Sequence, residues 1–179
     1  MNTALASRRE AGRRALPRRS VTVDVAIVSS AFAALAHLVA APSHYTWWPA
    51  AGVFFVALGI AQLLCAVMLL RGGYSRRFLL AGIWGTVGVI MIYVASRTIG
   101  LPMSPPVPFH GGRWVPGRSI VPDGAKYVGP LDIFTLVAEI LVVVTLLSML
   151  PKALKERTVN RLMWIGLALW GAAVVGVMR

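Results

Sequence analysis

Five long apolar runs, interrupted by very few charges, limit what this chain can fold into more than any other feature of its sequence. An α-helix needs about 20 apolar residues to cross the hydrocarbon core of a membrane. The runs fall at about 21–41, 50–70, 78–99, 130–150 and 162–178. They lack the alternation of a membrane β-strand, and backbone amides in lipid need internal partners. The sequence therefore predicts an all-α fold, an integral membrane bundle of about five transmembrane helices over residues 21–179.

The composition agrees with a membrane protein and argues against nucleic-acid binding. Apolar residues make up 58% of the chain and charged residues 13%, about half the charged share of an ordinary globular domain. The net charge of +12 comes from basic residues that flank the apolar runs instead of forming one basic face. We therefore expect the lipid bilayer, and no nucleic acid, as a partner. The single cysteine, Cys65, excludes an intramolecular disulfide.

The first 20 residues differ from the rest of the chain because they are polar and basic. Residues 1–20 hold six arginines and are broken by Pro17, so they predict a flexible cytoplasmic tail. A signal peptide is the alternative. The apolar run that follows is longer than the apolar region of a signal peptide, and more spans follow it, which favours a retained first helix.

The orientation follows from the distribution of Arg and Lys between the two sides of the predicted bundle. The tail, the connection near residue 75 and the connection 151–161 hold thirteen basic residues on one side. The other side holds Arg97, Arg113, Arg118, Lys126 and Arg179. Cytoplasmic loops carry the excess of positive charge. This predicts a protein of the plasma (inner) membrane with the N-terminus inside and, after five spans, the C-terminus outside.

The two predicted outer loops differ in length and composition. Residues 42–49 form a short loop after Pro42, with aromatic residues suited to the lipid headgroup layer. Residues 100–129 form a long loop that is rich in Pro and Gly. Loops of that length are commonly functional or disordered, and the prolines stiffen this one. We expect it to lie across the outer mouth of the bundle.

Small residues recur along three of the predicted helices. The three sets are Gly52, Gly59 and Ala66; Ala81, Gly85 and Gly88; and Ala168, Ala172 and Gly176. Small residues at helical spacing let two helix backbones approach closely in a membrane, so they indicate packing faces. The alternative is that Ala and Gly are simply abundant in this chain.

Four ionisable residues near the outer ends of the helices form the one site-like feature of the sequence. They are His37 and His44, around the end of the first helix, and Asp132 and Glu139 in the fourth. Asp132 and Glu139 share a helix face, with Glu139 about 10 Å deeper. Ionisable groups at membrane depth cost about 2.5–3.5 kcal/mol on insertion scales, so each needs a physical reason.

Two imidazoles and two carboxylates together suit a divalent metal such as copper, zinc or iron. We therefore treat these four residues as candidate metal ligands. His110 and Met103 in the long loop would add ligands that favour copper. The spacing matches no compact motif, since ligands on one helix usually recur three or four residues apart.

A structural role is the main alternative for the same residues. Arg97, at the outer end of the third helix, would neutralise Glu139 or Asp132 through a charge-assisted bond. His37 would donate to a backbone carbonyl, and Gln62 in the second helix would form an interhelical hydrogen bond. A proton pathway through Glu139 and His37 is a further alternative, which the scarcity of polar residues in the inner half disfavours.

Familiar catalytic motifs are absent from the sequence. There is no phosphate-binding glycine loop, no GxSxG, no HExxH and no CxxC. The sequence leaves the question of an enzyme open and leans against one. Three functions stay open: a membrane protein with an outer-facing metal or ligand site, an accessory or scaffold subunit of a larger membrane complex, and a transporter or proton pathway component.

Three segments carry a resemblance to a known group of proteins. The runs AHLVAAPSHYTWWPAAGVFFVALGIAQL, YVASRTIGLP and GPLDIFTLVAEI together resemble small multi-pass membrane proteins of actinobacteria with no assigned activity. The resemblance covers about residues 36–140. It implies that the four candidate ligands and Arg97 belong to one family motif, and it implies no chemistry. The acidic residue that the pattern places near Trp47 is absent here.

Overall fold

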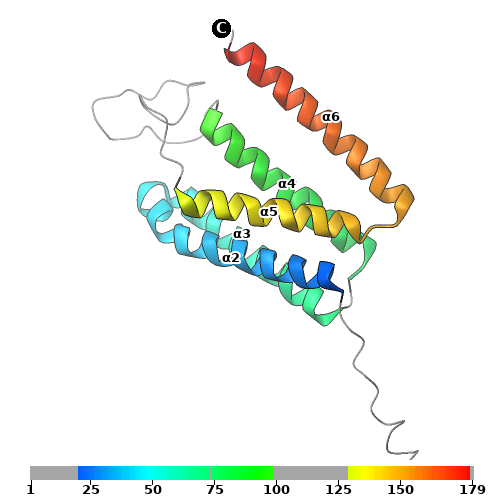
Figure 1. Ribbon diagram of the computed structural model, residues 1–179. Coiled ribbons are helices and arrows are strands. Elements are labelled where there is room, and N and C mark those ends of the chain that lie inside the picture. The colour runs from blue at the N-terminus through cyan, green and yellow to red at the C-terminus, as the bar shows by residue number, and fades with distance from the viewer. Residues whose placement is uncertain (1–19, 73, 99–128, 178–179) are drawn as a thin grey trace, which may run out of the picture.

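The computed structural model describes residues 20–72, 74–98 and 129–177, which fold into helices and short connections (Figure 1). The helices are α2 (Val21–Trp47), α3 (Pro49–Arg71), α4 (Arg76–Thr98), α5 (Pro130–Ser148) and α6 (Lys152–Val177). This confirms the predicted all-α fold. The predicted basic tail and long outer loop lie outside the described residues, apart from their last positions.

Four helices in the described ranges are long and apolar enough to cross a membrane, and they match the first four predicted spans. They cover Val21–Thr46, Pro49–Arg71, Arg76–Ala95 and Pro130–Ser148. The fifth predicted span falls in the second half of α6, and that α6 crosses the membrane stays a prediction. The described helices therefore fit a multi-pass membrane protein.

The first helix is longer than predicted, because α2 continues past Pro42 to Trp47. Proline removes a backbone donor and crowds the preceding turn of a helix. Two side chains that follow it form local hydrogen bonds to the carbonyl of Ala40. The Ser43 hydroxyl donates to this oxygen at 2.8 Å, and Nδ1 of His44 donates to it at 2.9 Å. Pro42 therefore interrupts the backbone ladder without ending the helix.

The predicted outer loop 42–49 is mostly helical as a result, and the chain turns from α2 to α3 at Trp48 alone. Trp48 has an extended backbone, and its N–H donates to the carbonyl of His44 at 2.7 Å. Pro49 begins α3, where its fixed φ and missing N–H suit the first helical turn. Because one residue joins them, α2 and α3 pack against each other from Trp48 onward.

The last helix also begins earlier than predicted, at Lys152 instead of residue 162. The segment KALKERTVNR, predicted as a loop, is rich in Ala, Leu, Lys, Glu and Arg, which are good helix formers. Pro151 precedes the helix, and its carbonyl accepts from the N–H groups of Leu154 and Lys155 at 3.0 and 2.9 Å. The apolar run covers the later part of this helix and does not predict where the helix begins.

The helix α5 occupies the centre of the bundle. It packs against α2, α4 and α6, and α2 also packs against α3 (Figure 1). One buried apolar cluster joins the beginnings of α2 and α4 to the ends of α3 and α5; its members are Ala26, Leu69, Leu79, Ile83, Val142, Val143, Leu146 and Leu150. We call this end of the bundle the basic end. The described basic residues there are Arg71, Arg76, Arg77, Lys152, Lys155, Arg157 and Arg161.

Small residues bring α3 close to α2, as predicted. Gly52, Gly59 and Ala66 are all buried. A Cβ atom at Gly59 would lie 2.7 Å from Cγ of Leu38, a distance that real Cβ atoms do not show. A Cβ at Gly52 would overlap Tyr45 in the same way. The spacing of seven residues in α3 therefore marks its contact face with α2.

The predicted small-residue stripe of α4 has a different outcome. A Cβ at Gly85 or at Gly88 would meet nothing within 4 Å in the described part of the chain. Abundance explains these glycines as well as packing does. In α6, the side chains of Ala172 and Gly176 lie outside the described residues.

Candidate functional site

His37 lies on the face of α2 that packs into the bundle. Its neighbours one turn earlier, Ala33 and Ala34, are fully buried, and His37 itself is 7% exposed. Small side chains on this face let the neighbouring helices approach, so a longer side chain between them reaches across the helix interface. The imidazole of His37 therefore points at other helices and not at lipid.

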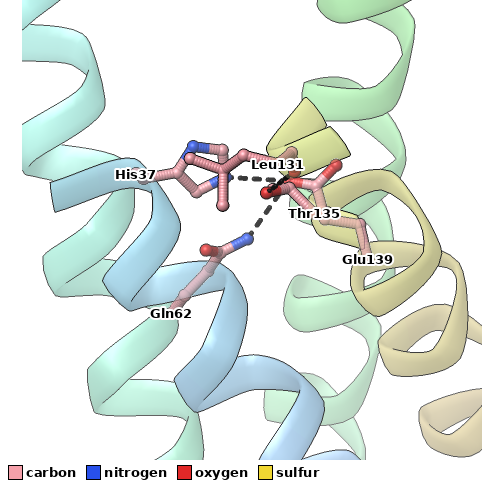
Figure 2. A network of polar contacts seen from close by, with 5 residues as sticks. All are labelled: His37, Gln62, Leu131, Thr135 and Glu139. Carbon is pink, nitrogen blue, oxygen red and sulfur yellow. Dashed lines mark hydrogen bonds and ion pairs between the residues drawn. The ribbon is translucent and has the colours of Figure 1, made fainter. Parts of the chain in front are cut away.

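Glu139 meets His37 from α5. The distance between His37 Nε2 and Glu139 Oε1 is 3.0 Å, and the two side chains are 8% and 3% exposed. Figure 2 shows the two side chains extending toward each other from α2 and α5. Glu139 lies two helical turns below the outer end of α5, about 10 Å deeper than Asp132. A carboxylate thus sits at membrane depth with an imidazole as its partner.

Gln62 adds a third helix to this contact. Its Nε2 donates to Glu139 Oε1 at 3.4 Å, a long hydrogen bond (Figure 2). Gln62 is 7% exposed, and within the described residues its Oε1 is buried without a hydrogen-bond partner. Gln62 therefore forms the interhelical hydrogen bond that the sequence predicts for it. We call His37, Gln62 and Glu139 the polar cluster.

A second polar contact joins α2 to α3 next to the polar cluster. The hydroxyl of Ser30, which is 1% exposed, donates to the backbone carbonyl of Gln62 at 2.8 Å. Ser30 lies two turns from His37 on the same face of α2. The backbone of Gln62 is therefore held by α2 while its side chain reaches α5.

His44 does not join the polar cluster, although it lies only two turns beyond His37. Its Nδ1 donates to the carbonyl of Ala40, and its ring stacks on Phe55 with a centroid distance of 4.1 Å. The ring of Phe55 also contacts that of His37, at 5.4 Å and a tilt of 58°. Phe55 therefore separates the two imidazoles, a role for which the sequence gives no signal because Phe55 belongs to a continuous apolar run.

Asp132 caps the start of α5. Its Oδ2 accepts from the backbone N–H of Gly129 at 3.2 Å, and a carboxylate in the first turn also interacts favourably with the helix dipole. Asp132 therefore has a local role at the helix end. The side chain of Arg97, the predicted charge partner, lies outside the described residues, as do His110 and Met103.

The four candidate metal ligands are therefore not gathered in one place. Only His37 and Glu139 contact each other, and within the described ranges no three His, Cys, Asp or Glu residues come together in a way that would hold a metal ion. Structural metal sites usually have four protein ligands, and catalytic sites three. Binding of copper, zinc or iron stays a prediction of the sequence, which the geometry of the described residues does not support.

The polar cluster has two chemical properties. It holds an acidic and a basic group in contact, so a single proton makes the pair net neutral either as imidazolium with carboxylate or as imidazole with carboxylic acid. It also joins three helices by hydrogen bonds in a region from which water is largely excluded. Removing one partner of such a pair is costly, because the other is left as an uncompensated buried group.

Comparisons with models of known protein families, with curated proteins and with solved structures give no match. The resemblance to membrane proteins of actinobacteria therefore stays a prediction.

Proposed function

We propose that this protein is a scaffold or accessory subunit of a membrane assembly, with the polar cluster as an internal lock. The observation that carries this proposal is the contact of an imidazole, an amide and a carboxylate from three different helices. Polar contacts of this kind can select one helix packing over others in a membrane. The lock connects α2 and α3 to α5, the helix on which α4 and α6 pack. The bundle would thus present its outer faces in a defined arrangement.

The outer faces supply the surface for partners in this proposal. Large apolar side chains are exposed on every helix of the described ranges, and in a membrane they contact lipid or other transmembrane helices. The partners would be other membrane subunits in the bilayer. The excess of basic residues at the basic end supports a plasma-membrane protein with its N-terminus inside. If α6 spans the membrane, the C-terminus is outside.

The scaffold proposal is tested by the size of the native assembly. We expect the chain, expressed at its natural level and extracted in a mild detergent, to migrate on a native gel as part of a larger assembly. His37→Leu should shift it to a smaller size, whereas His44→Leu, a matched histidine on the same helix, should not. Migration of the wild-type chain as a single copy would contradict the proposal.

A proton-binding role is the second candidate, and the 3.0 Å contact between Nε2 of His37 and Oε1 of Glu139 favours it. At this distance a proton passes between the two atoms without a change in the backbone. The amide of Gln62 presents either a donor or an acceptor to Glu139 by rotating, so it suits both protonation states of the carboxyl group.

The Glu139→Gln variant separates the two candidates. We expect it to lose about 1–2 kcal/mol of unfolding free energy, because a neutral amide still hydrogen-bonds His37 but forms no charge-assisted bond. For a proton-binding role, infrared spectra of the wild type at different pH values should show a carboxylic-acid band that changes with pH and is absent from Glu139→Gln. If the native assembly survives in this variant and the wild type shows no such band, the proton-binding role is excluded and the scaffold role remains.

A further inference from the structure

An apolar cleft lies between α4, α5 and α6, away from the polar cluster. Its volume is about 200 Å³, and all of its lining residues are apolar, among them Val87, Met91, Ile140, Val144, Ile165 and Gly166. The lining positions of α4 and α5 belong to helices that are long and apolar enough to cross a membrane. Unfilled apolar space forfeits dispersion contacts with the atoms that line it, so in a bilayer this cleft is filled.

The helices α4 and α6, on either side of the cleft, each carry a basic residue on the face that lines it. Arg76 lies eleven residues before Val87 on α4, and Lys155 lies eleven residues before Gly166 on α6. Eleven residues are close to three full helical turns, so each basic residue shares the face of its lining residue, about 16 Å nearer the basic end. The two basic residues are not among the lining residues of the cleft, but by helical periodicity they lie beyond it toward the basic end, and we call them the basic rim.

The two rim residues are available to bind an anion. Arg76 and Lys155 are both exposed, and neither forms an ion pair with another described residue. The acidic residue nearest to this rim in the sequence, Glu156, falls on a different face of α6 from Lys155 by helical periodicity. The structure gives no ion pair between these two side chains and another described residue, so their positive charge is available to an anion.

We propose that the cleft binds one anionic phospholipid, with an acyl chain between α4, α5 and α6 and the phosphate group held by Arg76 and Lys155. The acyl chain of such a lipid matches the apolar cleft, and its anionic headgroup matches the basic rim. Basic residues between transmembrane helices at the basic side of a membrane protein favour anionic headgroups. A transmembrane helix of a partner protein would fill the apolar part but would leave the two cations unmatched.

The proposal is tested by lipid retention on the full-length protein. The purified chain is incubated with equal amounts of phosphatidylglycerol and phosphatidylcholine that carry the same acyl chains, and bound lipid is counted by native mass spectrometry. We expect phosphatidylglycerol to be retained in preference. The double variant Arg76→Ala, Lys155→Ala should reduce this retention on the order of tenfold. The matched double variant Arg77→Ala, Arg157→Ala removes the same charge from other helix faces and should change retention less than twofold.

A third variant tests the apolar part of the cleft. A Cβ at Gly166 would meet nothing within 4 Å, so Gly166→Leu adds a side chain that starts in open space at the cleft, and it should reduce retention of both lipids. Equal retention of the two lipids, equal losses in both double variants, or full retention in Gly166→Leu would each overturn the proposal. So would a photo-cross-linker at residue 166 that captures a second polypeptide in native membranes while no lipid is retained.

Discussion

The His37→Leu variant is expected to lose about 3–5 kcal/mol of unfolding free energy, because it leaves the buried carboxyl group of Glu139 without its nearest polar partner. The side chain of Glu139 is 3% exposed, so water does not replace the imidazole. The amide of Gln62, at 3.4 Å, is neutral and supplies one long hydrogen bond. Reversible unfolding in mixed micelles, followed by helical circular dichroism, measures the change.

Three further variants show whether the loss comes from the pair. Glu139→Leu should also destabilise the fold, because it leaves the buried imidazole of His37 without its hydrogen-bond partner. The double variant should recover most of the loss, since apolar residues can replace a buried ion pair at little cost. His44→Leu removes a ring that hydrogen-bonds only within its own helix, so it should cost about 0.5–1.5 kcal/mol. Single-variant losses that simply add in the double variant would show that the two residues are not coupled.

The Gly52→Ala variant is expected to have the second largest effect, about 1–3 kcal/mol of unfolding free energy. A Cβ at Gly52 would lie 2.5 Å from Cα of Tyr45 and 2.8 Å from its backbone N. Backbone atoms cannot rotate away as a side chain can, so α2 and α3 must separate at their corner. The same unfolding measurement in mixed micelles determines the loss.

Two other glycines provide a graded control. Gly59→Ala should cost less than Gly52→Ala, because most of the clash is with the side chain of Leu38, which can change rotamer. Gly85→Ala should be close to neutral, because a Cβ there meets nothing within 4 Å in the described chain. Equal effects at all three positions would show that the close approach of α2 and α3 does not control stability.

The number and position of the first four spans could be predicted from hydropathy because lipid leaves the backbone no alternative to a helix. The ends of helices were less predictable. Pro42 was expected to end α2, but the helix continues past it to Trp47, and the side chains of Ser43 and His44 form local hydrogen bonds to the carbonyl of Ala40. The charged start of α6 was expected to be a loop, because a hydropathy pattern does not detect a polar helix.

Part of the polar cluster could also be predicted. His37 and Glu139 stood out because ionisable residues at membrane depth need a partner, and the structure pairs them. The sequence could not show that His44 turns to Ala40 and Phe55 instead. Side-chain spacing gives the depth of each residue and its helix face, but the rotation of one helix against another is set by packing. Candidates at one end of a bundle therefore need not share one site.

The measurement that tests the central claim most directly is the distance between His37 and Glu139 in a lipid bilayer. Solid-state NMR of the full-length protein, labelled with ¹⁵N in histidine and ¹³C in the carboxyl groups of glutamate, reports this distance through dipolar coupling. The chain has three histidines, and His37→Leu and Glu139→Gln samples assign the signals. The polar cluster predicts strong coupling between Nε2 of His37 and the carboxyl carbon of Glu139. A spectrum without this coupling would contradict the lock and every function proposed from it.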